Sequence, residues 1–395
     1  MKITKPHPLL NEHLLKSGIE WSSVLNIDSW MAFWEQNQTP PELHDDIEAL
    51  QKWLEKGHNA DMTYLAKNMH ARQNPRHLLS NVCSILSVVI PYATSGVSAA
   101  RQRTSASQKI ELSEQSKMLD KTARYARVVD YHKAIKKELN KAIEQWQTTA
   151  LEAKIIQAPV SWRVVTDALP FLDRAHARLA QLGFIGKNTM LIRPGIGSYF
   201  FIAHVLLSAD FSSVSDPHEV KPLAADAITQ LSCGDCTRCM DACPTQAIIA
   251  PRHLNAQRCL SYLTIEHRGL VDPSWIPHFA EHFYGCDVCQ DVCPYNFRIS
   301  ALKTIAAFKE NHSSLESLTI EDVASMTQLQ YEQWFGGTAM TRAKYAGLVR
   351  NALYSLHASH HPQLNAVLLQ RQQDPHPLIQ ATVSQLLELE KQKSV

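Results

Sequence analysis

Two cysteine-rich runs constrain this chain more than any other feature of its sequence. Eight of the nine cysteines lie between positions 233 and 293. The first run is Cys233-x2-Cys236-x2-Cys239-x3-Cys243-Pro244, the spacing that bacterial ferredoxins use to bind 4Fe–4S clusters. In two-cluster ferredoxins the fourth cysteine of such a run binds the other cluster, so a second set of thiolates is expected elsewhere in the chain.

The second run, Cys286-x2-Cys289-x3-Cys293-Pro294, supplies most of that set but lacks a middle cysteine. Cys259 lies between the two runs and can supply the missing thiolate. Two cubane clusters need eight thiolates in total, and the count then closes. We therefore predict one cluster on Cys233, Cys236, Cys239 and Cys293, and a second on Cys243, Cys259, Cys286 and Cys289.

Two other kinds of site use clustered cysteines, and the pattern favours neither. A disulfide framework is typical of short secreted chains, whereas this chain has 395 residues. Zinc ribbons contain C-x2-C pairs but not the x3-Cys-Pro ending. The two runs indicate that electrons pass through this region, but they do not identify the acceptor.

Composition sets broad limits on the class of protein. The chain is 45% hydrophobic, which is enough for a sizeable core. Its net charge of +1 does not by itself indicate a nucleic-acid partner. The first residues lack the apolar core of a signal peptide, and no apolar run reaches the ~18 residues of a membrane helix. We expect a cytoplasmic protein with no membrane segment.

Hydrophobic periodicity predicts alternating helices and strands before the cysteines. The first 70 residues or so read as helical, residues 84–90 as a buried strand, and residues 130–147 as a helix that Asp130 could cap. Residues 162–167 read as a strand ending in Asp167, residues 173–181 as a helix, and 199–207 as a strand or a buried helix. This pattern predicts an α/β or α+β layer domain.

The sequence after the cysteines reads as helical. Apolar residues recur at helical spacing in three segments, around positions 348–356, 364–368 and 379–387, which suggests HEAT-like stacking of short helices. Upstream, Gly186-Lys187-Asn188 resembles a phosphate-binding loop only superficially. A glycine five positions earlier and a serine or threonine after the lysine are both missing, so we reject ATP binding there.

Several short motifs together resemble those of the epoxyqueuosine reductase family, and the resemblance covers nearly the whole chain. The motifs are Arg72-x2-Pro75, Asp130-Tyr131-His132, Asp167-x2-Pro170, Gly186-Lys-Asn-Thr189, Gly197-Ser198, the first cysteine run, Asn255-x3-Cys259 with Ser261 and Thr264, Tyr284 through Pro294, and Arg350-Asn351. Each motif is weak alone, and the series is specific.

The resemblance implies an α+β chain of three parts. These are an α/β cobalamin-binding catalytic domain over 1–225, a ferredoxin-like domain with two 4Fe–4S clusters over 226–300, and an α-helical HEAT-like tRNA-binding domain over 301–395. The implied activity is reduction of epoxyqueuosine to queuosine at the wobble position of tRNA. Cobalamin would carry the two-electron chemistry, because no side chain supplies such electrons. An external donor such as flavodoxin or ferredoxin would charge the clusters, and we expect a monomer.

The resemblance also nominates site residues. Asp167 is the expected proton donor, with Asp130 as the alternative, and we expect burial beside the corrin to raise the pKa of the acid. Residues expected at the cofactors are Arg72, Asp130, Lys187, Asn188, Ser261 and Asp287. Arg342, Lys344 and Arg350 are expected to contact tRNA phosphates. A solvated helix face would explain those three basic residues almost as well.

Two alternative functions stay open at the level of sequence. A corrinoid reductive dehalogenase also combines cobalamin with two clusters, but such enzymes normally carry a twin-arginine signal and lack a HEAT-like tail. A simple two-cluster electron-transfer protein would not need the roughly 225 residues that precede the clusters.

Overall fold

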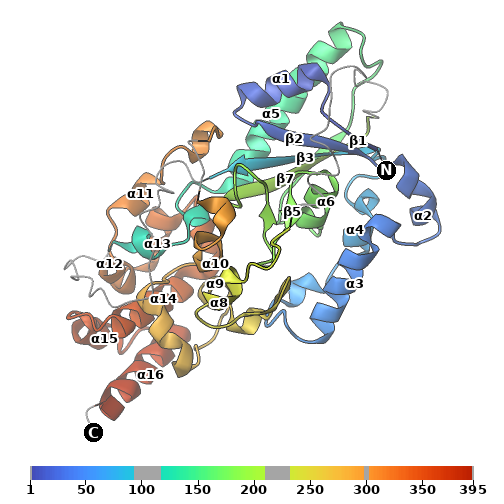
Figure 1. Ribbon diagram of the computed structural model, residues 1–395. Coiled ribbons are helices and arrows are strands. Elements are labelled where there is room, and N and C mark those ends of the chain that lie inside the picture. The colour runs from blue at the N-terminus through green and yellow to red at the C-terminus, as the bar shows by residue number, and fades with distance from the viewer. Residues whose placement is uncertain (1, 93–116, 210–231, 298–301, 394–395) are drawn as a thin grey trace.

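A computed structural model describes residues 2–92, 117–209, 232–297 and 302–393. Its central element is a five-stranded sheet in the order β1-β2-β3-β7-β4, with every neighbouring pair antiparallel (Figure 1). The strands are β1 (Lys2–Thr4), β2 (Trp21–Asn26), β3 (Ser84–Pro91), β7 (Phe200–Leu207) and β4 (Trp162–Val165). The chain is therefore a mixed helix and sheet protein.

Strand β3 lies at the centre of the sheet and is buried along its whole length. It pairs with β7 from Ser84↔Leu207 to Pro91↔Phe200, which settles residues 200–207 as a strand. The expectation that the first 70 residues are helical was wrong for β1 and β2. Val24 and Leu25 of β2 point into cores on opposite faces of the sheet, and this burial by distant partners outweighs local helical spacing.

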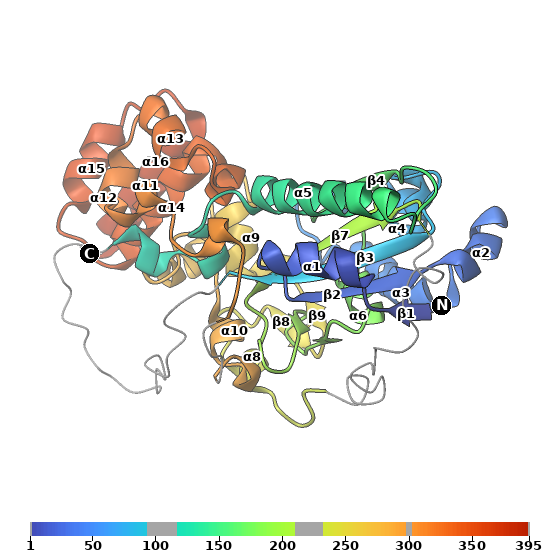
Figure 2. The same cartoon turned by 90° about the horizontal axis from the view of Figure 1, so that it is seen from above.

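Helices cover both faces of the sheet (Figure 2). Helices α1 (Pro8–Lys16) and α5 (Tyr131–Glu152) pack on one face. Helices α2 (Met31–Glu35), α3 (Pro41–Glu55) and α6 (Asp173–Leu179) pack on the other. Asp130 caps α5 as predicted, because its side chain accepts a hydrogen bond from the His132 amide at 3.1 Å.

The cysteine region consists of short elements that position loops. They are α8 (Arg238–Asp241), β8 (Ile248–Ala250), β9 (His253–Leu254), α9 (Leu260–Ile265) and α10 (Val288–Asp291). Upstream of it, β5 (Phe184–Ile185) pairs with β6 (Leu191–Ile192), and α4 (Met69–Gln73) precedes β3. No helix in the described ranges is long and apolar enough to cross a membrane.

The C-terminal helices gather at one end of the molecule (Figure 2). They are α11 (Ser313–Glu316), α12 (Ile320–Ser325), α13 (Gln328–Phe335), α14 (Lys344–Ala358), α15 (Leu364–Arg371) and α16 (Pro377–Lys393). They share a core with the cysteine region and with residues 118–126. Ile305 and Phe308 instead pack against the sheet. Both expected domain boundaries, 225/226 and 300/301, lie outside the described residues, so the division into three domains stays a prediction.

Arg350 of α14 corrects one expected tRNA contact. The residue is 0% exposed, and its guanidinium donates to the main-chain oxygens of Leu263, His267 and Gly269 at 2.6–2.9 Å. It also donates to Asn351, whose own amide donates to the carbonyls of Thr264 and Phe283. Arg350 is thus an internal brace between α14 and the cysteine region, and it cannot reach a phosphate.

We predict that Arg350→Ala lowers the free energy of unfolding by about 3–5 kcal/mol, because several buried carbonyls lose their donors at once. Urea titration followed by circular dichroism measures the effect. Lys344→Ala is the matched control, since Lys344 is exposed in the same helix, and it should change stability by no more than ~0.5 kcal/mol. Equal stability of the two variants would contradict the bracing role.

Candidate active site

Asp167 lies two residues beyond β4, facing the first residues of α5. Its carboxylate accepts a hydrogen bond from the Tyr131 hydroxyl at 2.5 Å and lies 2.9 Å from Nε2 of His132. The other ring nitrogen of His132, Nδ1, lies 2.9 Å from the carboxylate of Asp130. Tyr131 and His132 of this motif therefore contact Asp167, and Asp130 orients the imidazole of His132.

Hydrogen bonds within this network shift the pKa values of Asp167 and His132 in the free protein. Burial would raise the pKa of Asp167, but hydrogen bonds from His132 and Tyr131 outweigh it and lower the pKa below 3.8. The side chain is 56% exposed, which further weakens any effect of burial. Burial likewise lowers the pKa of His132, but Asp167 and then Asp130 outweigh it and raise the pKa above 6.5. The expected rise in the pKa of Asp167 concerns a carboxyl covered by a corrin, and it stays a prediction.

A second pair of polar side chains lies behind Asp167. Arg72 is buried and donates to the Phe171 carbonyl at 3.4 Å, while its Nε has no hydrogen-bond partner. Oδ1 of Asp173 is also buried without a hydrogen-bond partner. Burial, with a smaller effect of the Asp167 charge, raises the pKa of Asp173 to about 7. Arg72 and Asp173 thus leave one buried donor and one buried acceptor without a hydrogen bond. Unpaired buried groups of this kind cost free energy of folding unless a ligand pairs with them.

The cysteine thiols fall into two groups. Cys293 lies close enough to Cys233, Cys239 and Cys236 for their charges to raise its pKa, although burial is the larger cause. In the same way burial and then Cys259 and Cys243 raise the pKa of Cys286. None of the nine cysteines, all of which lie in the described ranges, forms a disulfide. Cys293 therefore lies near three thiols of the first run, and Cys286 lies near Cys259 and Cys243. The assignment of four cysteines to each cluster stays a prediction.

Within the described residues no three His, Cys, Asp or Glu side chains are close enough to hold a single metal ion. A cubane cluster binds its four cysteines at four separate irons and so holds them farther apart than one ion does.

One aromatic residue connects the second cysteine group to the carboxylate network. The ring of Tyr125 lies 6.3 Å from that of Tyr131 and 6.3 Å from that of Tyr284. A Cβ added at Gly285 would lie 3.6 Å from the Tyr125 ring. Because Gly285 precedes Cys286, the loop that carries this thiol lies against Tyr125, whose ring neighbours that of Tyr131 beside Asp167.

Arg124 makes a charged junction at the same loop. Its guanidinium donates to Asp291 and to the Tyr199 hydroxyl, each at 2.6 Å, and its amide donates to Asp287 at 2.8 Å. Asp287, expected at a cofactor, is thus used to hold the residues around Arg124. No local pattern points to Arg124, because its partners lie 75 to 167 positions away.

Lys187 and Asn188 lie on the cysteine loops. The Lys187 amide approaches Sγ of Cys233 at 3.4 Å, and its ammonium donates to the Gly234 carbonyl at 2.7 Å. Asn188 is buried and donates to the Cys289 carbonyl at 3.2 Å. Ser261 is half-buried beside Cys259. The structure therefore places these three residues around the thiols, and their contact with a corrin stays a prediction.

Basic side chains gather where the C-terminal helices meet the cysteine region. Arg342 is 49% exposed and forms a two-point pair with Glu266, with both distances 2.8 Å. Lys344 is exposed. Arg268, which the sequence analysis missed, donates to the Arg342 carbonyl at 2.8 Å and is also exposed. The excess of positive charge suits an anionic ligand.

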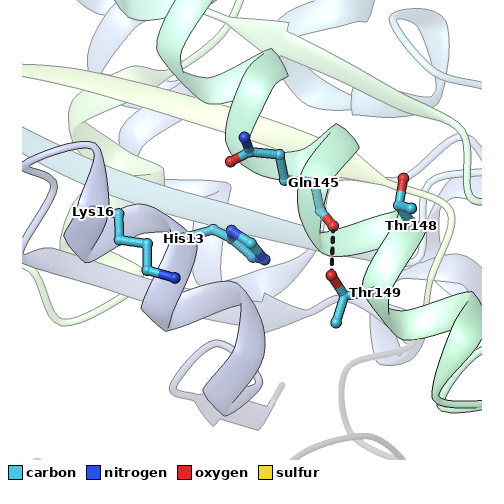
Figure 3. Close-up of a pocket in the computed structure, with 5 residues that line it drawn as sticks. All are labelled: His13, Lys16, Gln145, Thr148 and Thr149. Carbon is cyan, nitrogen blue, oxygen red and sulfur yellow. Dashed lines mark hydrogen bonds between the residues drawn. The ribbon is translucent and has the colours of Figure 1, made fainter.

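A groove of about 370 Å³ lies between α1 and α5 (Figure 3). Its lining residues are His13, Lys16, Gln145, Thr148 and Thr149. None of the residues discussed above lines it. We assign it no role in the chemistry of the site.

The cysteine loops define the class of protein. Residues 232–296 match a family model described as a 4Fe-4S double cluster binding domain. Residues 72–168 match a model described as Epoxyqueuosine reductase QueG, DUF1730. The protein is thus an iron–sulfur oxidoreductase with a double cluster domain.

Relatives that span most of the chain define the family. An epoxyqueuosine reductase from Cellulophaga algicola is 33% identical over 309 residues, covering 78% of this chain and 89% of that protein. Another, from Xanthomonas campestris pv. campestris, is 32% identical over 343 residues, covering 87% and 88%. The chain belongs to the epoxyqueuosine reductase family.

A solved structure shares the fold. It is that of an epoxyqueuosine reductase with a tRNA-Tyr epoxyqueuosine-modified stem loop. The TM-score is 0.72 at 22% identity, and the match covers 95% of this chain and 88% of that one. The likeness extends through the sheet, the cysteine region and the C-terminal helices.

We predict that Cys259→Ser lowers the iron content of anaerobically purified protein from about eight to about four atoms per chain, because one of two clusters loses a ligand. Cys83→Ser is the control. Cys83 is half-buried beside β3, outside both groups, so this variant should keep about eight irons. Full iron content in Cys259→Ser would show that the assignment of Cys259 is wrong.

The pair of His132 and Asp167 predicts a window of pH in which it stabilises the fold. Because the pKa of His132 is raised, its contribution to stability is fully present below pH 6.5 and is lost as the pH rises through its pKa in the folded protein. Because the pKa of Asp167 is lowered, its contribution to stability is present above pH 3.8 and is lost as the pH falls through its pKa in the folded protein. The Tm advantage of wild type over His132→Gln should therefore be greatest between these limits. His44→Gln, at an exposed histidine, is the control; a pH-independent difference for His132→Gln would contradict the pair.

Proposed function

We propose that this chain reduces epoxyqueuosine, at the wobble position of tRNA, to queuosine. Membership of the epoxyqueuosine reductase family supports the proposal. The observation that carries it is the position of Asp167, which lies 2.9 Å from Nε2 of His132 and one aromatic residue away from the Cys286 loop. A proton source beside an electron relay is what reductive removal of an epoxide oxygen requires.

Converting the epoxide to an alkene consumes two electrons and two protons and releases water. We propose that the first proton comes from the pair of His132 and Asp167. In this proposal His132 carries a proton on Nε2, 2.9 Å from Asp167, and passes it to the carboxylate, which delivers it to the epoxide oxygen. Asp130 keeps the ring oriented through Nδ1, and the Tyr131 hydroxyl fixes the other carboxylate oxygen.

We propose cobalamin as the cofactor that faces this acid. When bound, it would supply a strong nucleophile and the electrons for the epoxide carbon. The unpaired Nε of Arg72 and the unpaired Oδ1 of Asp173 fit the carboxamide arms of a corrin, because each arm offers both an acceptor and a donor. These two residues would hold the periphery of the ring.

The electron path follows from the two cysteine groups. We propose clusters on Cys233, Cys236, Cys239 and Cys293, and on Cys243, Cys259, Cys286 and Cys289. The second set includes the Cys286 loop that contacts Tyr125, so its cluster would deliver electrons to the site. The first would accept them from an external donor such as flavodoxin or ferredoxin.

We further propose that the C-terminal helices form a HEAT-like domain that binds tRNA through phosphate contacts. The related structure with a modified stem loop supports RNA binding at this fold. Arg342 and Lys344 remain the nominated residues, and Arg268 joins them. The anticodon loop would bind as a single strand with the target base turned into the site.

We predict that wild-type protein with cobalamin and a chemical reductant converts an epoxyqueuosine stem-loop RNA to queuosine, detected by mass spectrometry of the digested RNA. Asp167→Asn should lower kcat by at least ~100-fold while iron content and cobalamin binding stay unchanged. Asp120→Asn, at an exposed carboxyl, is the control. If wild-type protein that contains both clusters and cobalamin forms no queuosine, the proposed function is wrong.

A further inference from the structure

Tyr64 is an exposed aromatic residue held at the junction of the sheet region and the C-terminal helices. It lies in a short 3-10 turn, Thr63–Leu65, and 43% of the residue is exposed. The guanidinium carbon of Arg342 lies 5.2 Å from the centre of its ring. One face of the ring is therefore supported by a cation, while much of the remaining surface is open to solvent.

The support under the ring is rigid. Arg342 donates through Nε and Nη2 to the two carboxylate oxygens of Glu266, both at 2.8 Å. Arg268 donates to the Arg342 carbonyl and so holds the main chain at the same point. Two guanidinium groups surround one carboxylate, which leaves a net positive charge beside the ring.

Tyr64 also lies at the edge of the Asp167 site. The Asp130 amide donates to the Gly337 carbonyl at 2.7 Å, and the Tyr284 hydroxyl donates to the Ala339 carbonyl at 2.7 Å. The segment Ala339–Ala343, which carries Arg342, is thereby tied to the start of α5. Burial, then the charge of Glu266 and, more weakly, that of Asp167 raise the pKa of Tyr64, as expected for a phenol near that site.

We propose that Tyr64 is the stacking surface for a nucleobase of the anticodon loop, with Arg342 supporting its other face. This inference rests on the proposed function and names a substrate contact within it. A flat, partly exposed ring with a fixed cation against it and positive charge around it is the arrangement that binds unpaired bases in single-stranded RNA. Stacking tolerates any base, so this contact would position the loop rather than read its sequence.

The test measures RNA binding and turnover in three substitutions. The probe is a fluorescein-labelled anticodon stem-loop RNA carrying epoxyqueuosine, with Kd from anisotropy at fixed salt. We expect Tyr64→Phe to bind within about twofold of wild type, because the ring face is kept. Tyr64→Leu and Tyr64→Ala should raise Kd and KM by roughly tenfold or more, with kcat at saturating RNA within about twofold. Leu329→Ala, at a leucine that is 64% exposed on α13, controls for loss of apolar surface and should bind as wild type does.

Three outcomes would overturn the inference. Wild-type Kd for Tyr64→Leu would remove the need for an aromatic face. A Kd for Tyr64→Phe as weak as that for Tyr64→Leu would assign the contact to the hydroxyl. Weaker cobalamin binding by Tyr64→Ala, at unchanged RNA affinity, would place the ring in the cofactor pocket. Iron content and circular dichroism of each variant show that it is folded, and Tyr64→Phe keeps the test valid if the smaller side chains fail. Failure of wild type itself to reduce the RNA would instead count against the proposed function.

Discussion

The close contact between residues 117–130 and the Cys286 loop is the constraint on which the rest of the structure depends. The Ala123 amide donates to the Tyr284 carbonyl at 2.8 Å, and Gly285 adopts a φ of +70°. A Cβ at Gly285 would lie 2.6 Å from the Cβ of Ala123, so only glycine permits this approach. The contact holds a cysteine loop against the segment that leads into α5 and so fixes the distance between electron relay and acid.

The same segment is tied at both ends to the C-terminal helices. The Met118 amide donates to the Leu318 carbonyl at 3.0 Å, and the Asp130 amide donates to that of Gly337. Arg350 adds a buried brace between α14 and the cysteine region. These contacts join the sheet, the cysteine loops and the C-terminal helices.

The proton at the site is positioned by opposing environments. In the free protein, hydrogen bonds from His132 and Tyr131 outweigh burial and lower the pKa of Asp167, while Asp167 and Asp130 outweigh burial and raise the pKa of His132. A flat cofactor and a base that cover Asp167 would remove its water and push its pKa upward. The proton would then move from the imidazole to the carboxylate only when the site is filled.

The sequence by itself determined the cysteine pattern, the main strands and helices after residue 80, and the motif that surrounds Asp167. These follow from local spacing, because ligand runs, periodicity and caps are written within a few residues of one another. Tertiary structure alone decided that β2 is a strand, that Arg350 is buried, and that Tyr64, Arg124 and Arg268 lie at the sites. The contacts of those residues join positions far apart in the chain, and the free energy of such contacts depends on burial and charge that no local pattern records.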